Sequence, residues 1–334
     1  MKRFTYNQAD LELMSKDIDL VTNDIHIWND FYGQSSVIKK KIFNSKTLYS
    51  TLEHGVGFDD IIWHIDKNSV FKSSIIFSEF RKMVYKSQTK NYIFNIGSII
   101  NYVELKEKYE QKDSIYFLTH STHEINVNVN LQQIINELKI LPQTIRPEYV
   151  CIYWKDIQRG KHKIFLDNGY KVISAGHMYD KLFLYRLKEI FLNFKVLITN
   201  ELGSHVFHAS NCGLEIVVPY NLTSCYFTDK YALSNFFDRK NEIIEFEKTI
   251  QSTSIVNDFF IEIFNKDDFF HKELQKIFLN HFCSTIRLSK YHMILIHIFT
   301  WLVHVIKPNG FTKHLFDFLY VRLDRKISKY LIKN

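Results

Sequence analysis

The stretch VLITNELGSHVFHASNCGLEIVVPY, residues 196–220, predicts a strand, a turn, a short helix and a second strand. The apolar residues 196–198 run into the polar pair Thr199 and Asn200, and Gly203 opens the helix. A helix that starts at a glycine just beyond the carboxyl end of a strand presents free N–H groups and a partial positive charge. The stretch therefore indicates either an anion site suited to phosphate or simply a well-capped helix.

The chain before this stretch repeats the same alternation of strand and helix. Short apolar strands are expected at residues 114–118, 149–153 and 170–174, and helices at residues 131–141, 156–167 and 182–194. Repeated units of this length predict an α/β fold with a parallel sheet and helices on both faces. In such sheets ligands bind beyond the carboxyl ends of the strands, so the residues that follow each strand are the candidates for a site.

Three of these strand ends carry histidine beside small or polar residues. The candidates are His120 with Ser121, His177, and the group Asn200, Gly203, Ser204 and His205. A single histidine is most often structural, but histidines at three strand ends favour a functional site. His120 and His123 have a spacing of three residues, yet no helix is predicted there and no partner carboxylate is evident, so no metal is expected.

A second candidate lies in the N-terminal third of the chain. Residues 53–57, EHGVG, form a compact glycine turn that holds the carboxylate of Glu53 and the imidazole of His54. Gly55 and Gly57 let the backbone approach a ligand closely, although a simple turn is an equal interpretation. The sequence contains neither a G-x-G-x-x-G nor a G-x-x-x-x-G-K-[ST] motif, so a dinucleotide fingerprint and a P-loop are not supported.

Length and composition predict more than one folded unit. The chain has 334 residues, of which 46% are apolar, and this is enough for two domains of ordinary size. Pro142 and Pro147 suggest a break. We expect an N-terminal domain at residues 1–142, a second domain at 143–275, and C-terminal helices with a basic amphipathic tail at 276–334.

Charge and cysteine usage narrow the class of protein. The net charge of +7 is modest and no nucleic-acid-binding module is recognisable, so a nucleic-acid partner is not expected. The four cysteines lack C-x-x-C spacing, which is typical of reduced thiols in a cytosolic protein. We therefore expect a cytoplasmic location.

The end of the chain raises the question of a membrane. The apolar run at residues 293–306 is 14 residues long, too short to span a bilayer. Residues 307–334 hold seven Lys or Arg against two Asp. This pattern fits either a helix pair that packs on the body of the protein or contact of residues 291–334 with the anionic surface of the inner membrane.

Three segments carry a resemblance to a known family. They are YVCIYWKD at residues 149–156, VISAGH at 172–177 and TNELGSH at 199–205. With them, residues 110–220 resemble the nucleotide-binding domain of bacterial GT-B glycosyltransferases that assemble surface polysaccharide and lipopolysaccharide. A more remote similarity is to CMP-sugar-dependent sialyl- and Kdo-type transferases. These transferases carry an acidic-acidic-Gly motif, which residues 53–55 match except that a histidine replaces the second acid. They also carry a His-Pro motif, which residues 120–121 match except for the missing proline.

The resemblance implies two Rossmann-like domains with a cleft between them. It implies a metal-independent glycosyltransferase without a cofactor, which moves a sugar from a CMP- or UDP-linked donor to a lipopolysaccharide, O-antigen or capsule glycan. The donor phosphates would lie against the residues His120, Ser121, His177, Asn200, Gly203, Ser204 and His205. Glu53 or His54 would be the catalytic base. A sugar-nucleotide epimerase or hydrolase of the same fold, a transferase of a phosphate-linked group, and a non-catalytic partner in polysaccharide assembly remain alternatives.

Overall fold

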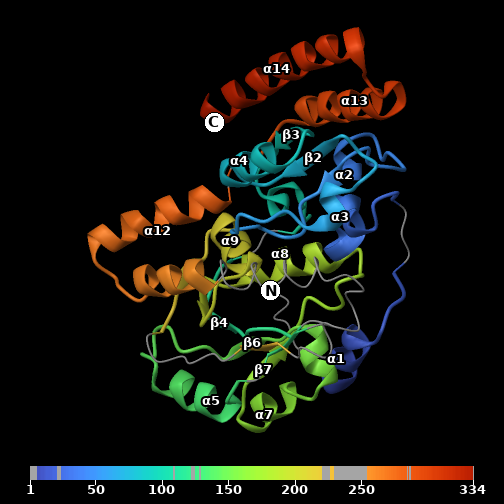
Figure 1. The fold of residues 1–334 in the computed structure, drawn as a ribbon. Helices are drawn as coiled ribbons and strands as arrows, with labels where there is room; N and C mark the ends of the chain where they lie inside the picture. The colour runs from blue at the N-terminus through green and yellow to red at the C-terminus, as the bar shows by residue number, and fades with distance from the viewer. Residues whose placement is uncertain are drawn as a thin grey trace.

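A computed structural model of the chain describes residues 6–20, 24–107, 110–121, 125–127, 129–219, 226–228, 254–283, 285 and 287–333. This part of the chain contains two parallel sheets and a set of C-terminal helices (Figure 1). The architecture is therefore α/β, as the sequence predicts. The sheets and helices are compatible with a Rossmann-like fold, and the GT-B arrangement stays a prediction.

The larger sheet has five strands. They are β4 (Ser114–Phe117), β6 (Tyr149–Cys151), β7 (Lys171–Ile173), β8 (Val196–Thr199) and β9 (Glu215–Val217). Their order in space is β7-β6-β4-β8-β9, and every neighbouring pair is parallel. The chain starts at the central β4, moves outward through β6 and β7, and then returns to β8 on the other side of β4. This doubly wound order places the switch point between β4 and β8, where such sheets bind ligands.

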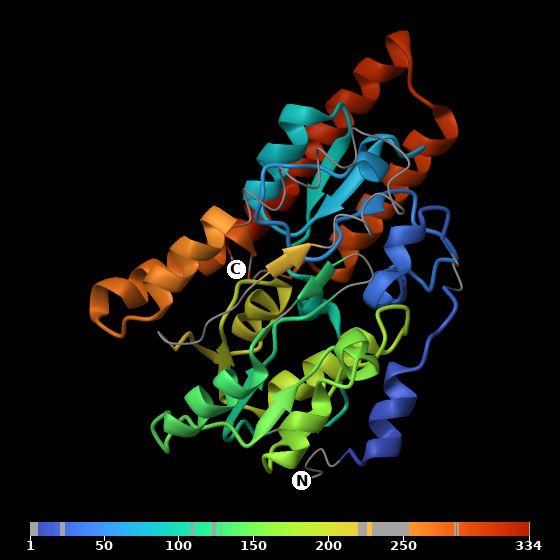
Figure 2. The same cartoon turned by 60° about the horizontal axis from the view of Figure 1, so that its bottom comes forward.

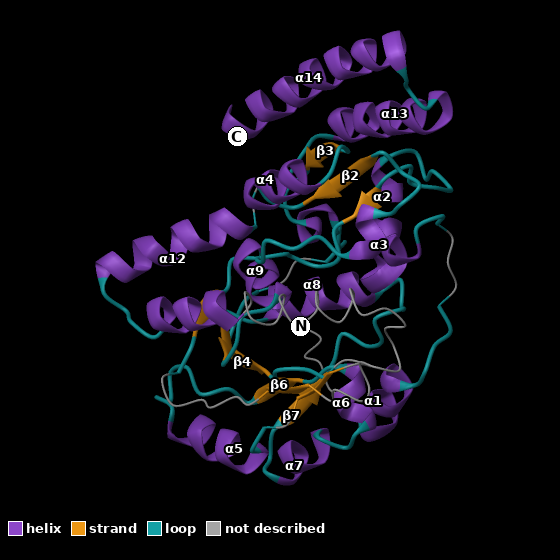
Figure 3. Cartoon of the chain, in the orientation of Figure 1, coloured by secondary structure: helices purple, strands orange, loops and turns teal. Residues whose placement is uncertain are grey.

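Helices cover both faces of this sheet, as Figure 3 shows. They are α5 (Leu131–Ile140), α6 (Trp154–Gln158), α7 (His162–Asp167), α8 (Phe183–Asn193) and α9 (Ser204–Asn211). Successive residues of β4 alternate between two cores: Ile115 and Phe117 pack with α8 and α9, whereas Tyr116 packs with α5 and α7. Because alternate residues of a strand point to opposite faces, a strand such as β4, which is buried at every position, requires a helix layer on each side.

The strands and helices predicted between residues 114 and 217 are confirmed, with one difference. The helix expected at residues 156–167 is two helices, α6 and α7, and Gly160 lies between them with a φ of 77°. A residue in this left-handed conformation cannot continue a helix, so the chain turns there.

The smaller sheet lies in the N-terminal part of the chain. It consists of β1 (Thr51–Leu52), β2 (Ser73–Ile76) and β3 (Tyr92–Asn95), paired in parallel in that order. The helices around it are η1 (Ile27–Gly33), α2 (Gln34–Lys41), α3 (His64–Lys67), α4 (Glu79–Gln88) and η2 (Ile99–Tyr102), and α1 (Gln8–Ser15) precedes them. Phe94 of β3 and Leu197 of β8 belong to one continuous core, so the two sheets pack as a unit. The predicted division at residue 142 falls inside the five-stranded sheet, because β4 and α5 precede it.

The C-terminal helices are α12 (Phe269–Phe282), α13 (Lys290–Ile306) and α14 (Gly310–Lys333). A further helical segment covers residues 254–264, and β5 (Ile125–Val127) pairs antiparallel with β10 (Tyr226–Thr228). The hairpin of α13 and α14 packs on the small sheet, where the Tyr320 ring lies 5.1 Å from that of Tyr92 and 5.5 Å from that of Phe94. Within the described ranges, no helix has both the length and the apolar character to cross a membrane.

Candidate functional site

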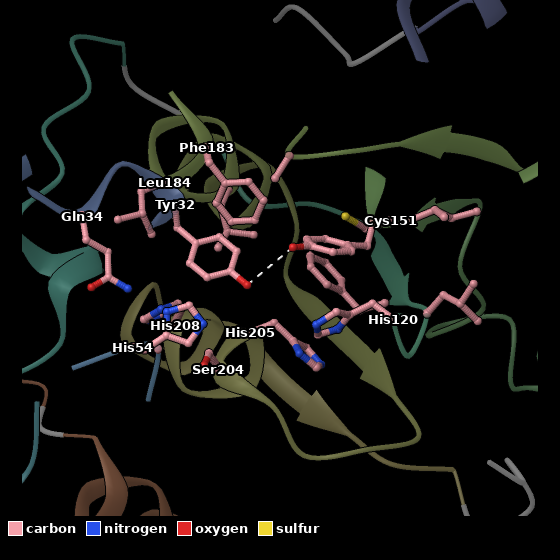
Figure 4. Close-up of a pocket in the computed structure, with 17 residues that line it drawn as sticks. Tyr32, Gln34, His54, His120, Cys151, Phe183, Leu184, Ser204, His205 and His208 are labelled. Carbon is pink, nitrogen blue, oxygen red and sulfur yellow. Dashed lines mark hydrogen bonds between the residues drawn. The ribbon is translucent and has the colours of Figure 1, made fainter. Parts of the chain in front are cut away.

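A cavity of about 200 Å³ lies between the two sheets, at the switch point of the larger one. Residues at or just beyond the carboxyl ends of β4, β6 and β7 form one side of it. Tyr32 of η1, the start of α2, residues of α8 and α9, and the turn at residues 53–57 form the rest. Figure 4 shows this lining, with His54, His120, Ser204, His205 and His208 among the labelled residues. The cavity is therefore where the strand order predicts a ligand.

The two motifs singled out in the sequence meet at this cavity. The Val56 N–H donates a hydrogen bond to Ser204 Oγ at 2.9 Å, across 148 positions of the chain. Gly55 has a φ of 73°, and a Cβ placed on it would lie 2.8 Å from Ser204 Oγ. Only glycine accommodates both the backbone conformation and the close approach. The turn at residues 53–57 thus packs directly on the start of α9.

The start of α9 keeps the features of an anion site. Gly203 is the N-cap residue in an extended conformation, and within the described residues no side chain caps the helix. The first N–H groups of a helix have no intrahelical partner, and they carry the positive end of the helix dipole. Ser204 and His205, at this helix start, both line the cavity.

Three histidines of the cavity wall are uncharged at neutral pH. Burial lowers the pKa of His54 to about 4, that of His205 to about 3 and that of His208 to about 4. The His205 ring stacks on Phe117 with an interplanar angle of 5°, and its Nε2 lies 3.1 Å from Thr199 Oγ1. These contacts hold a neutral ring against an apolar wall.

Of the three histidines, His54 has the least satisfied hydrogen-bonding capacity. Its ring packs among Trp28, Phe31 and Tyr32, with centroids 5.2 to 5.6 Å away. Its Nδ1 atom is buried and has no hydrogen-bond partner among the described residues, and the same holds for Gln34 Oε1. An unpaired buried polar atom costs about 1–3 kcal/mol, and a bound ligand would remove that cost. His54 and Gln34 both line the cavity.

The lining is polar in places but carries no formal charge. Among the described residues that line the cavity, none is Lys, Arg, Asp or Glu. The hydroxyl oxygens of Tyr32 and Tyr153 lie 3.5 Å apart across it, as the dashed line in Figure 4 marks. Basic side chains that would neutralise donor phosphates are thus not part of the wall, and the helix start is its main positive element.

Glu53 does not face the cavity. Its Oε1 accepts hydrogen bonds from Arg81 Nε at 2.6 Å and from the Gly57 N–H, and its Oε2 accepts from the Phe77 N–H at 2.9 Å. Burial raises the pKa of Glu53 to about 7, against the lowering effect of Arg81 and the backbone donors. Its carboxylate therefore holds the turn in place, and of the two predicted base candidates only His54 reaches the cavity.

The other predicted site residues also fall into two groups, those that line the cavity and those that lie behind its wall. His120 lines the cavity and lies against the Tyr153 ring, with centroids 4.7 Å apart. Ser121 is buried, and its Oγ accepts a hydrogen bond from the Val127 N–H. His177 is buried against Trp154, with centroids 3.8 Å apart, and does not line the cavity.

Asn200 also stands behind the wall. Its Oδ1 accepts hydrogen bonds from the Tyr116 hydroxyl at 2.9 Å and from Thr119 Oγ1 at 3.1 Å, which ties β4 to β8 at the switch point. The structure thus brings His54, Gly55, His120, Ser204 and His205 together at the cavity. Glu53, Ser121, His177 and Asn200 support the walls around it.

Several site residues carried little signal in the sequence. His208 follows Ser204 by one helical turn, so its position on the cavity side could have been inferred from helical spacing. Tyr32 and Gln34 come from a kinked segment with no recognisable pattern. Glu201 follows β8, and burial raises its pKa to about 8, although it does not line the cavity.

A metal is not evident at this site. No group of three His, Cys, Asp or Glu side chains that could hold an ion occurs in the part of the chain that the structure describes. His123, the possible partner of His120, lies outside that part.

No protein-family model, curated protein or solved structure matches this chain.

Proposed function

We propose that this protein is a glycosyltransferase that binds a nucleotide sugar in the cavity and transfers the sugar to a bacterial cell-surface glycan, without a metal. The observation that carries the proposal is the position of the cavity at the switch point between β4 and β8, beside the start of α9. In doubly wound sheets this is where nucleotides bind, with phosphate at the helix start.

Residues of the cavity wall can carry out each step of the sugar transfer. The acceptor hydroxyl oxygen attacks the anomeric carbon, and the bond from that carbon to the donor phosphate breaks. The nucleotide leaves with the electron pair, and the N–H groups at Ser204 and His205 stabilise its charge. The hydroxyl proton passes to His54. An imidazole with a pKa of about 4 is a weak base, but an anionic phosphate nearby favours the protonated ring and raises its pKa.

The uncharged lining favours a second candidate function. Because no cation in the described wall opposes a leaving phosphate, the cavity also suits an uncharged glycan held by a non-catalytic partner in polysaccharide assembly. A sugar-nucleotide hydrolase or epimerase, or a transferase of a phosphate-linked group, would share the nucleotide site and differ in the product.

A thermal-shift panel with CMP, CDP, UDP and GDP tests the proposal. We expect one nucleotide to raise the melting temperature, because a ligand that binds only the folded state stabilises it. Ser204→Ala should reduce that shift, and His54→Gln should keep it while lowering turnover by about 10²–10⁴-fold. His314→Gln, at an exposed histidine of α14, is the matched control.

The outcomes separate the candidates. Sugar found on an added glycan, with a chelator present, supports the transferase; free or epimerised sugar supports the hydrolase or epimerase. If no nucleotide shifts the melting temperature but a neutral glycan does, the non-catalytic function replaces our proposal.

A further inference from the structure

The outward face of α13 is apolar and uncovered. Residues at helical spacing along it are exposed by 42 to 57% of their surface; they are Tyr291, Ile298, Trp301 and Val305. The opposite face of the same helix is buried on the body of the protein, through Met293, Ile296, Phe299 and Val303. A helix that is apolar on both faces needs a second apolar environment, and no described part of the chain supplies one.

The outward face of α14 continues this surface. Leu315, Phe318 and Leu319 near its start are exposed by 52, 54 and 40%. Lys326 lies two turns beyond Leu319, and its Nζ lies 4.6 Å from the centre of the Tyr291 ring and donates a hydrogen bond to the Tyr291 hydroxyl. The exposed sides of the two helices therefore adjoin, and we call this joint surface the outer face of the hairpin. Phe311 and residues 331–334 have no described side chains.

The charges on the outer face are all positive. The sequence of α13 contains no Asp or Glu, and α14 contains only Asp317 and Asp324. Both aspartates point to the body of the protein: Asp317 Oδ1 accepts from the Tyr92 hydroxyl at 2.8 Å, and Asp324 Oδ1 accepts from Lys82 Nζ at 2.6 Å. The exposed cations of α14 include Arg322, Arg325, Lys326 and Lys329.

A basic pocket borders the same face. It has a volume of about 390 Å³, lies at the start of α13, and is also lined by Tyr330 of α14. Lys40, Lys41, Arg287 and Lys290 line it, and the single carboxylate in its described wall is Glu104, which pairs with Lys41 and Arg287. Four cations against one anion leave a net positive charge next to the apolar surface.

We propose that the outer face of the hairpin docks on an anionic lipid bilayer. The exposed apolar side chains of α13 and the start of α14 enter the interfacial region, and the cations of α14 and of the basic pocket contact the lipid headgroups. Tyr291 and Trp301 have the amphipathic rings that favour this depth. Figures 1 and 2 show that the hairpin lies at the end of the molecule away from α5 and α7, so a flat surface can reach it.

Vesicle co-sedimentation of the full chain tests the proposal. We expect binding to vesicles of phosphatidylcholine mixed with phosphatidylglycerol, and weaker binding at high salt or to phosphatidylcholine alone. Arg322→Gln with Arg325→Gln should weaken binding to the mixed vesicles on the order of 25-fold, since each charge near an anionic surface contributes about fivefold. Ile298→Ser with Trp301→Ser should abolish binding.

Matched controls come from the opposite end of the molecule. Ile140→Ser on α5, where the side chain is 71% exposed, and Lys163→Gln on α7 should bind as the wild type does. Brominated lipids should quench the tryptophan fluorescence of the wild type more than that of Trp301→Phe. The proposal would be overturned if binding did not depend on lipid charge and if neither the arginine variants nor the Ile298 and Trp301 variants bound more weakly than the wild type. A dimer that Trp301→Ser converts to a monomer without any vesicle binding would also overturn it, because that result assigns the face to a second copy of the chain.

Discussion

At the scale of single residues, the pair of Glu53 and Arg81 shows how a buried charge can hold the turn at residues 53–57 in place. Both side chains are almost fully buried, at 2% and 4% exposure, and their atoms lie 2.6 Å apart. Arg81 also donates to Asp59, so its guanidinium connects the turn at residues 53–57 to the next loop. Removing one partner of such a pair leaves an uncompensated charge in the interior.

We therefore expect Glu53→Ala to lower the free energy of unfolding by about 3–5 kcal/mol in urea denaturation. Glu53→Gln should cost less, because its amide oxygen can still accept a hydrogen bond. Glu104→Ala is the matched control: Glu104 is 66% exposed and pairs with Lys41 and Arg287, and such surface pairs contribute about 0–1 kcal/mol. Equal losses in Glu53→Ala and Glu104→Ala would show that Glu53 has no such structural role.

At the scale of elements, the contact between the 53–57 turn and α9 joins the two sheets at the cavity. Gly55 and Gly160 have nearly the same left-handed φ, 73° and 77°, but different surroundings. A Cβ on Gly55 meets Ser204 Oγ, whereas a Cβ on Gly160 meets no described atom within 4 Å. Comparison of the two positions separates backbone strain from the inter-element contact.

Gly160→Ala should cost about 1–2 kcal/mol of stability, from the left-handed backbone alone. Gly55→Ala should cost more, because the turn must also move away from α9. In the double variant Gly55→Ala with Ser204→Gly, the added methyl no longer meets the hydroxyl, so part of the loss should return. Thermal or urea unfolding of the four proteins measures these differences, and equal losses at Gly55 and Gly160 would contradict the contact.

At the scale of the whole molecule, burial of neutral histidines between the two sheets makes stability depend on pH. The pKa of His208 falls from its usual 6.5 to about 4, so the unfolded chain binds a proton in this interval that the folded chain does not. The contribution of His208 is fully present above pH 6.5 and is lost as the pH falls toward 4. His54 and His205 act in the same direction, whereas Glu53 and Glu201, whose pKa values are raised, act in the opposite direction.

The difference between the wild type and His208→Gln isolates one of these groups. Between pH 7 and pH 5.5 the wild type should lose about 1 kcal/mol of unfolding free energy more than the variant does, because one proton is taken up on unfolding. Urea denaturation of both proteins at the two pH values measures this difference. If the difference in unfolding free energy between the two proteins does not change with pH, His208 titrates in the folded protein as it does in the unfolded chain.

The local sequence determined the elements of the larger sheet. Runs such as residues 115–118 and 196–198 are apolar at every position, which requires burial on both faces and therefore a parallel strand between helix layers. Histidine and glycine after these strands marked His120, Ser204 and His205, because the carboxyl ends of parallel strands share one edge. Local patterns are sufficient for such inferences, since they depend on neighbours along the chain.

Only the tertiary structure decided which residues form the site. Glu53 and His54 are adjacent in the sequence, but Arg81 draws the carboxylate inward while the imidazole lies at the cavity. His177 is turned into the core by Trp154, and Gln34 arrives from a distant helix. Each of these placements depends on a partner far away in the chain, whose position the local sequence does not encode. The stretch at residues 196–220 thus predicted its own strand and helix, and packing determined that the 53–57 turn faces it.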